Sequence, residues 1–325
     1  MNSSENILLF VGGFPGGGTD LIKTIMNSHP EIYLNGEMPL LKNIEDYGYG
    51  PQSKFKSLEE IQSFQHVLSK MNLWNNIENI NHDFSEEINK FDSLSRDEIL
   101  KVCFSKDERR VWGNKTPQNT ENIELLSNLF PDARFLIITR DVRDICLSWR
   151  DKWGKDMIWC ASKWSDRMSV SWNASRRMEG KRVLFIRYED LLLDTESTLQ
   201  MICNFLFIPF SEKLLEHHKY TSELIDGKRN YGRKIIKDNI AKWRNNLSEV
   251  FVERIEEIAF NAMETFNYEI VYANHWKPIT NLEKWRGKIN DALALALVGN
   301  RAKDKNDISQ RARDIIFQLR KQSLK

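Results

Sequence analysis

Short, almost wholly apolar runs alternate along this chain with longer stretches in which apolar residues recur every three or four positions. The runs predict buried parallel strands, strong at Ile7–Val11, Arg134–Thr139 and Arg182–Arg187 and weaker at Ile32–Leu34 and Val111–Gly113. The longer stretches predict helices, chiefly at 19–28, 58–71, 97–105, 119–129, 142–153, 158–178, 195–206 and 250–265. Because strands and helices alternate, we expect an α/β fold with a central parallel sheet flanked by helices.

Two segments depart from this alternation. Residues 47–93 are polar, rich in Asn and Ser and poor in strand signals, so they predict a helical insertion that caps the site. Residues 282–298 carry apolar side chains at helical spacing, and residues 308–324 form a basic helical pattern. We therefore expect an α/β domain over 1–275 and a C-terminal helical extension over 276–325. This extension either packs on the core or, alternatively, forms a homodimer contact or surface anchor.

Composition narrows the choice of function. The 325 residues carry 47 Lys and Arg against 46 Asp and Glu, a net charge of +1, which argues against a nucleic-acid partner held by a global positive field. No stretch reaches the roughly 20 apolar residues of a membrane span, and the first ten residues lack a basic leader region. The four cysteines are scattered without a CxxC pair, which predicts buried free thiols. We expect a cytoplasmic protein.

A glycine-rich turn follows the first predicted strand, in the text ILLFVGGFPGGGTDLIKT. Five of the seven residues 12–18 are glycines, so backbone N–H groups are exposed, and the next helix adds the positive end of its dipole. The turn predicts a phosphate cradle, with a mobile loop as the alternative. A Walker P-loop ends in Gly-Lys-Ser/Thr, which is absent here and weakens an ATPase interpretation. The candidate binding residues are Gly13, Gly16, Gly17, Gly18, Thr19 and Asp20.

Two further candidates follow later strands. Arg140 comes directly after Arg134–Thr139, at the sheet edge where α/β proteins bind ligands, and Ser148 lies about two helical turns further on. A guanidinium and a hydroxyl suit a phosphate monoester, although a charged helix start with local ion pairs is an equal alternative. Tyr188 follows the strand Arg182–Arg187, where its ring can lie against a nucleobase or simply pack in the core.

Taken in this order, these segments resemble the sulfotransferases that use 3′-phosphoadenosine 5′-phosphosulfate (PAPS), especially the branch containing tyrosylprotein and many bacterial small-molecule sulfotransferases. The matching segments are GGFPGGGTDLIKTIMNSHPEIYLNGE, WGNKTPQN, LFPDARFLIITRDVRDICLSW and VLFIRYEDLLLDTESTLQMICNFL. A fifth segment, KDNIAKWRNNL, matches more weakly. The resemblance covers most of residues 6–270, and its blocks are specific in combination. The resemblance implies a P-loop-like α/β fold.

The resemblance also implies roles for individual residues. The loop Gly13–Thr19 would hold the 5′-phosphosulfate, Arg140 and Ser148 the 3′-phosphate, and Tyr188 would lie near adenine. A late loop would close over the 3′-phosphate, with Trp243 as a packing anchor. The basic residues of that loop are Arg233, Lys234 and Lys237.

Two residues match the catalytic positions of that branch. Glu37, in YLNGE, matches the carboxylate base, with capping of a following helix as the alternative. His29 is a rival base, which we interpret instead as closing the helix before it. Lys115, in GNKTP, matches the lysine that steadies the transferred group; taken alone, it would be a solvated loop lysine.

The chain departs from the family pattern at two loop positions. Gly16 stands where the family usually carries Lys or Arg, and Asp20 stands where it usually carries a second Thr or Ser. A carboxylate there is unfavourable for an anion unless it caps the helix or meets Lys23. The missing positive charge must then come from Lys115 or Arg233. We favour an active enzyme in which basic residues from other parts of the chain supply this charge. A slow enzyme, or a relative that only binds the donor, is less favoured.

We therefore expect an enzyme that moves a sulfuryl group from PAPS to a hydroxyl or amine of a small molecule, such as a bacterial natural product. It would release 3′-phosphoadenosine 5′-phosphate (PAP) and need no metal. Tryptophans at 149, 153, 159 and 164, with Met157, line an acceptor pocket or belong to the core. The alternatives are a P-loop-type nucleotide kinase or other phosphotransferase, and a non-catalytic nucleotide-binding relative.

Overall fold

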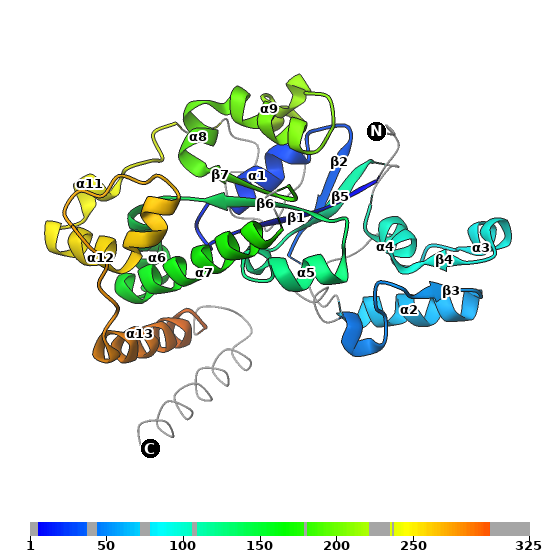
Figure 1. The fold of residues 1–325 in the computed structure, drawn as a ribbon, viewed down its shortest axis with the longest axis horizontal. Helices are drawn as coiled ribbons and strands as arrows, with labels where there is room; N and C mark the ends of the chain where they lie inside the picture. The colour runs from blue at the N-terminus through cyan, green and yellow to red at the C-terminus, as the bar shows by residue number, and fades with distance from the viewer. Residues whose placement is uncertain are drawn as a thin grey trace, which may run out of the picture. The chain divides into compact units, whose positions relative to one another are not determined.

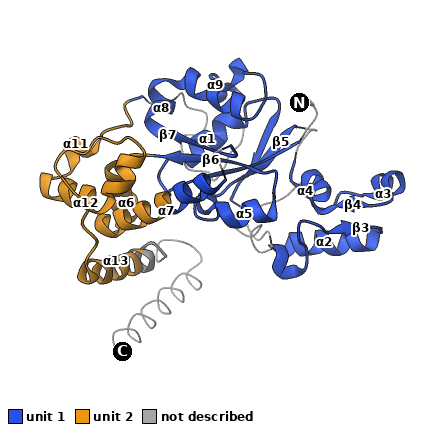
Figure 2. Cartoon of the chain, in the orientation of Figure 1, with its two compact units in different colours: residues 1–139, 170–237 blue, residues 140–169, 238–325 orange. Residues whose placement is uncertain are grey.

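A computed structural model describes residues 6–37, 44–71, 79–105, 109–178, 181–220, 235 and 237–299. Its contacts divide the chain into two compact units, shown in Figure 2. The first comprises residues 1–139 and 170–237, and the second comprises residues 140–169 and 238–325. Among the helices in the described ranges, none has the length and apolar character that crossing a membrane requires.

The first unit contains a five-stranded parallel sheet (Figure 1). Its strands, in spatial order, are β2 (Ile32–Asn35), β5 (Val111–Lys115), β1 (Ile7–Gly13), β6 (Arg134–Thr139) and β7 (Val183–Arg187). The parallel register places the carboxyl ends of all five strands at one edge. The predicted strands and the α/β class with a P-loop-like sheet are confirmed.

Alternate residues of these strands face two helical layers. Phe10 of β1 and Phe135 of β6 belong to one core, which they share with α4 (Arg96–Phe104) and α5 (Ile123–Leu129). The neighbouring Leu9 is buried as well, and in Figure 1 the opposite side of the sheet is covered by another set of helices. This set comprises α1 (Thr19–Met26), α8 (Tyr188–Leu193) and α9 (Thr195–Phe205). The short α10 (His217–Tyr220) contacts α1.

The predicted insertion is helical, with a small sheet that the sequence did not indicate. It contains α2 (Leu58–Met71) and α3 (Ser85–Phe91), and its two short strands pair in antiparallel fashion. These strands are β3 (Lys54–Phe55) and β4 (Leu94–Ser95). Ser95 then begins α4 with a capping box in which Glu98 is the partner.

The second unit is helical. Its described residues form α6 (Val142–Trp153), the first part of α7 (Met157–Arg177), α11 (Trp243–Asn246), α12 (Glu249–Thr265) and α13 (Asn281–Gly299).

Within the second unit, α13 packs closely on the start of α7. A Cβ atom added at Gly287 would lie only 2.3 Å from Cβ of Trp159, so the two backbones approach closely there. Lys163 and Asp291 form an ion pair at 3.2 Å across the same contact. This part of the predicted C-terminal extension therefore packs on its own chain, whereas residues 308–324 lie outside the described ranges. The boundary at residue 276 stays a prediction.

Candidate functional site

The glycine-rich turn joins β1 to α1 at the carboxyl edge of the sheet. Gly16 and Gly18 have φ values of 88° and 100°, a region that favours glycine, and the N–H of Gly17 donates to the carbonyl of Phe14 at 2.8 Å. Gly18 is the N-cap of α1 and supplies no side chain to accept from the first-turn N–H groups. These N–H groups are therefore available to an anion, because no capping side chain competes for them.

The loop leaves no room for larger residues. A Cβ atom at Gly13 would lie 2.7 Å from Cγ2 of Thr19 and 2.8 Å from Cγ2 of Ile138. One at Gly18 would lie 2.4 Å from Cδ2 of Tyr188, which is itself 5% exposed. Tyr188 thus packs against the backbone of the loop at Gly18. The contact of Tyr188 with adenine stays a prediction.

Two buried asparagines fix the turn after β5 to the neighbouring strand β1, a role that sequence reasoning missed. Asn119 donates to the carbonyl of Val11 at 3.1 Å and to Oδ1 of Asn114 at 2.9 Å. Thr116 donates to the same Oδ1 atom and, through its N–H, to Val11. The signal in the sequence was the unusually polar segment NKTPQN, which begins within the last two residues of the buried strand β5.

Lys115 binds two carboxylates at the end of β5. Its Nζ atom lies 2.7 Å from Oδ1 of Asp20 and 2.9 Å from Oε1 of Glu37. The lysine side chain is 6% exposed, whereas each carboxylate side chain is 55% exposed. Burial lowers the pKa of Lys115, but the charges and hydrogen bonds of Asp20 and Glu37 outweigh burial and raise the pKa above its ordinary value.

This cluster corrects one interpretation. Lys115 is not a solvated loop lysine, because it is the last residue of a strand and is buried. Asp20 contacts Lys115, a pairing that the sequence analysis did not predict. The predicted base and the predicted lysine are in direct contact.

His29 has a structural role. Its Nε2 atom lies 2.9 Å from the carbonyl of Pro209, and its Nδ1 atom accepts from the N–H of Glu31 at 3.0 Å. These contacts require a neutral ring, in agreement with the lowered pKa that burial causes. Both nitrogens are occupied by backbone groups, so His29 is not available as a base.

Arg140 and Ser148 belong to the second unit. The Arg140 side chain is 8% exposed; its Nη2 atom donates to the carbonyl of Asn239 at 2.9 Å and lies 3.7 Å from Oδ2 of Asp144. The Oγ atom of Ser148 is buried and has no hydrogen-bond partner among the described residues. A buried hydroxyl in this state is suited to a ligand oxygen, because leaving it unsatisfied is costly.

Arg143 fixes the start of α6. It donates to both oxygens of Asp141 and, at 2.5 Å, to Oε1 of Glu256 on α12, and its guanidinium lies 3.7 Å from the ring centroid of Trp243. The carboxylate of Glu256 also accepts from three backbone N–H groups. The charged residues at the start of α6 therefore form a network of ion pairs. Trp243 is buried and packs on this network, in agreement with the anchoring role that the resemblance implied. The N–H groups bonded to Glu256 are those of Val271, Tyr272 and Ala273.

The tryptophans divide between core and surface. Trp149 and Trp164 are buried, and Lys163 lies over the ring of Trp159, which is half-buried. Trp149 and Trp164 therefore pack in the core, and an acceptor pocket lined by tryptophans stays a prediction.

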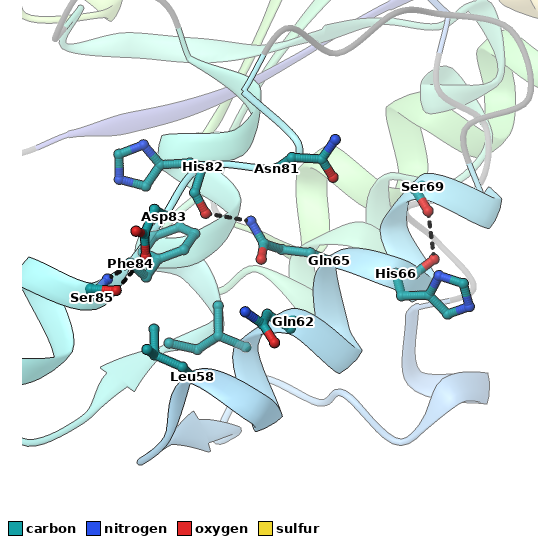
Figure 3. A pocket seen from close by; sticks show the side chains of 11 residues that line it. Leu58, Gln62, Gln65, His66, Ser69, Asn81, His82, Asp83, Phe84 and Ser85 are labelled. Carbon is teal, nitrogen blue, oxygen red and sulfur yellow. Dashed lines mark hydrogen bonds between the residues drawn. The ribbon is translucent and has the colours of Figure 1, made fainter.

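A cavity of about 460 Å³ lies in the insertion, and none of the predicted site residues lines it (Figure 3). It is lined by α2 and by the segment leading into α3, where Gln65 donates to the carbonyl of His82 at 2.9 Å. The predicted Arg233 and Lys234 lie outside the described residues, and Lys237 is exposed.

Comparison with known proteins gives the family. The model of the sulfotransferase family matches residues 9–212, more than half of the chain. The chain belongs to the sulfotransferase family. It is similar to protein-tyrosine sulfotransferase A of Caenorhabditis elegans, with 23% identity over 269 residues, covering 77% of this chain and 64% of that one. It is 26% identical to protein-tyrosine sulfotransferase 2 of Gallus gallus over 67% of this chain and 55% of that one, so it spans under two thirds of either relative.

Solved structures agree on the fold of this sulfotransferase-family chain. It aligns with the sulfotransferase domain from the olefin synthase of Synechococcus PCC 7002 at a TM-score of 0.57 and 19% identity, covering 83% of this chain and 98% of that domain. The sulfotransferase domain from the curacin biosynthetic pathway aligns at a TM-score of 0.53 and 15% identity, covering 83% and 100%. These alignments confirm the predicted fold, and the family match over residues 9–212 confirms the predicted family.

Proposed function

We propose that this protein transfers a sulfuryl group from PAPS to a hydroxyl or amine of a small-molecule acceptor and releases PAP. The observation that carries the proposal is the glycine loop. It presents backbone N–H groups at the start of α1 without a capping side chain, and Lys115 ends the adjacent strand beside Asp20. Amides and a lysine in this arrangement suit the two anionic groups of a phosphosulfate.

The residues that would hold the donor fit its chemistry. The loop from Gly13 to Thr19 would bind the 5′-phosphosulfate. A side chain at Gly13 would clash with Thr19 and Ile138, and one at Gly18 with Tyr188, so either would displace the backbone of this loop. Arg140 and Ser148 would bind the 3′-phosphate, and the buried Ser148 hydroxyl that lacks a partner among the described residues supports this assignment. Arg233 and Lys234 stay predicted contributors, since they lie outside the described residues.

Sulfuryl transfer needs orientation and positive charge more than covalent catalysis, as phosphoryl transfer does. Lys115 would stabilise the charge that develops on the transferred group and on the leaving oxygen. Glu37 would accept the proton of the acceptor, since its carboxylate is 55% exposed and remains accessible while it contacts Lys115. No step in this scheme assigns a role to a metal.

Two acceptor classes are supported by different observations. Two structural neighbours, with TM-scores of 0.57 and 0.53, come from an olefin synthase and from a biosynthetic pathway, which favours a small molecule. Several curated relatives are protein-tyrosine sulfotransferases, which favours the phenolic hydroxyl of a tyrosine in a peptide. The small molecule is our first choice and the tyrosine hydroxyl our second.

The test is incubation with PAPS labelled on the sulfuryl group, in the presence of separate pools of small hydroxyl compounds, small amines and tyrosine peptides. We expect labelled product and an equal amount of PAP with one pool. PAP release without labelled product would indicate hydrolysis, and no PAP release in any pool would contradict the proposed reaction. Lys115→Met, which removes the ammonium, should abolish transfer in whichever pool is active.

A further inference from the structure

The glycine loop carries no positive side chain of its own. None of residues 12–19 is basic, and Gly16 has a φ of 88°, where an L-amino acid with a long side chain would be strained. A cation for the transferred group must therefore reach the loop from another element of the fold.

Lys115 is such a cation, and Asp20 is the group that holds it at the loop. Asp20 is the second residue of α1, directly after the loop, and its Oδ1 atom lies 2.7 Å from Nζ of Lys115. Glu37, which follows the end of β2, contacts the same Nζ atom at a distance of 2.9 Å. The ammonium is thus fixed between two anchors, one of which belongs to the helix that the loop begins.

We propose that Asp20 is a positioning residue: it draws the Lys115 ammonium to the start of α1 and so supplies the glycine loop with the positive charge that its own side chains lack. This inference rests on the proposed function. It accounts for a carboxylate beside an anion site, because the charge of Asp20 is used to orient a lysine rather than to contact the donor. Lys115 has three N–H donors, so one remains for a ligand oxygen after Asp20 and Glu37 are bound.

The simple alternative is that Asp20 only repels the donor. The two accounts predict opposite changes in the affinity for PAPS when the charge of Asp20 is removed. If Asp20 only repels, Asp20→Asn removes a negative charge and PAPS binds more tightly. If Asp20 positions Lys115, the same substitution leaves the ammonium with Glu37 alone, and PAPS binds more weakly although a negative charge is gone. We expect about tenfold weaker binding, the loss of roughly one well-placed charged contact.

The experiment is titration calorimetry of the full chain with PAPS, comparing wild type, Asp20→Asn, Asp20→Glu and Lys115→Met, alone and with Asp20→Asn. Positioning predicts weaker binding by Asp20→Asn, partial recovery in Asp20→Glu, and no further loss when Asp20→Asn is added to Lys115→Met. Equal or tighter binding by Asp20→Asn in the wild-type background would overturn the proposal.

A pH series and a matched control separate positioning from a general loss of structure. Because Asp20 helps to raise the pKa of Lys115, Asp20→Asn should lose PAPS affinity at a lower alkaline pH than wild type; an unchanged profile would count against the proposal. The control is Glu124→Gln, which removes another exposed first-turn carboxylate that pairs with a single cation, Arg177, at 2.6 Å. It should bind PAPS as wild type does. A wild-type protein that binds neither PAPS nor PAP would instead refute the proposed function itself.

Discussion

The ring of Tyr188 lies directly against the backbone of Gly18, so that an added Cβ atom would be 2.4 Å from Cδ2 of the tyrosine. Gly18 also has a φ of 100°, and it is the N-cap of α1. One position therefore combines a backbone conformation that favours glycine with a contact that admits no side chain. The tyrosine after β7 and the loop after β1 form one packed unit at the edge of the sheet.

This contact predicts that Gly18→Ala distorts the loop. We expect PAP binding to weaken by at least about tenfold, because the N–H groups of the loop no longer converge. Gly48→Ala is a matched control, since Gly48 has a φ of 87° but nothing within 4 Å of its added Cβ atom. The backbone of Gly48→Ala should be strained to a similar degree, yet this variant should still bind PAP. Equal loss of binding in both variants would show that the Tyr188 contact is unimportant.

Glu37→Gln should separate binding from turnover. The variant keeps the size of the side chain but cannot accept a proton, so we expect PAP affinity close to that of wild type and a loss of transfer of about a hundredfold or more. The measurement is PAP release with the active acceptor pool, together with calorimetry. Glu269→Gln, which removes an exposed carboxylate paired with Arg244, should change neither quantity. If Glu37→Gln abolishes PAP binding, the residue is structural.

The buried carboxylate of Glu256 should be important for stability. It accepts from Arg143 and from three backbone N–H groups, and it is 0% exposed. Glu256→Ala leaves the three backbone N–H groups and Nη1 of Arg143 without this acceptor, although Asp141 still pairs with Arg143. Breaking a buried ion pair in this way typically costs about 3–5 kcal/mol of unfolding free energy. Urea denaturation measures this loss. Glu253→Ala, on the exposed face of the same helix, is the control, and similar unfolding midpoints for both variants would contradict the prediction.

Acid should weaken the attachment of α13 through Glu283. The hydrogen bond from Arg254 lowers the pKa of Glu283 from 4.5 to about 2. A lowered carboxyl pKa stabilises the folded state above the unfolded value and loses that effect as the pH falls toward the folded value. The melting temperature of wild type should exceed that of Glu283→Gln at pH 7, and the difference should shrink between pH 4.5 and 2. A constant difference over this range would contradict the assignment.

Much of this fold could be predicted because its strands are buried on both faces. The apolar runs at 7–11 and 134–139 are unambiguous, and the helices between them begin and end within a few residues of the predicted positions. The two-residue strands β3 and β4 were missed, since runs so short carry no periodic signal. The spatial order of the strands was also not predicted, because it depends on contacts between distant segments.

The residues of the candidate site could be predicted from the sequence, but the contacts between them could not. The glycine turn, Arg140 and Ser148 were identified from position and chemistry, and Glu37 and Lys115 from the family resemblance. The pairing of Lys115 with Asp20 was not, because it joins residues 95 positions apart on separate elements. The same holds for the Asn119 hydrogen bond to Val11, which is 108 positions distant.

The account depends most directly on whether one nucleotide carrying both a 5′-phosphate and a 3′-phosphate is bound selectively. Thermal unfolding in the presence of PAP, adenosine 5′-phosphate or ATP measures this for wild type and for Arg140→Ala, with Arg150→Ala as a control on the exposed face of the same helix. We predict that PAP raises the melting temperature of wild type and Arg150→Ala far more than the other nucleotides do, and that Arg140→Ala loses this preference. Equal stabilisation by all three nucleotides, or none by PAP, would contradict the account.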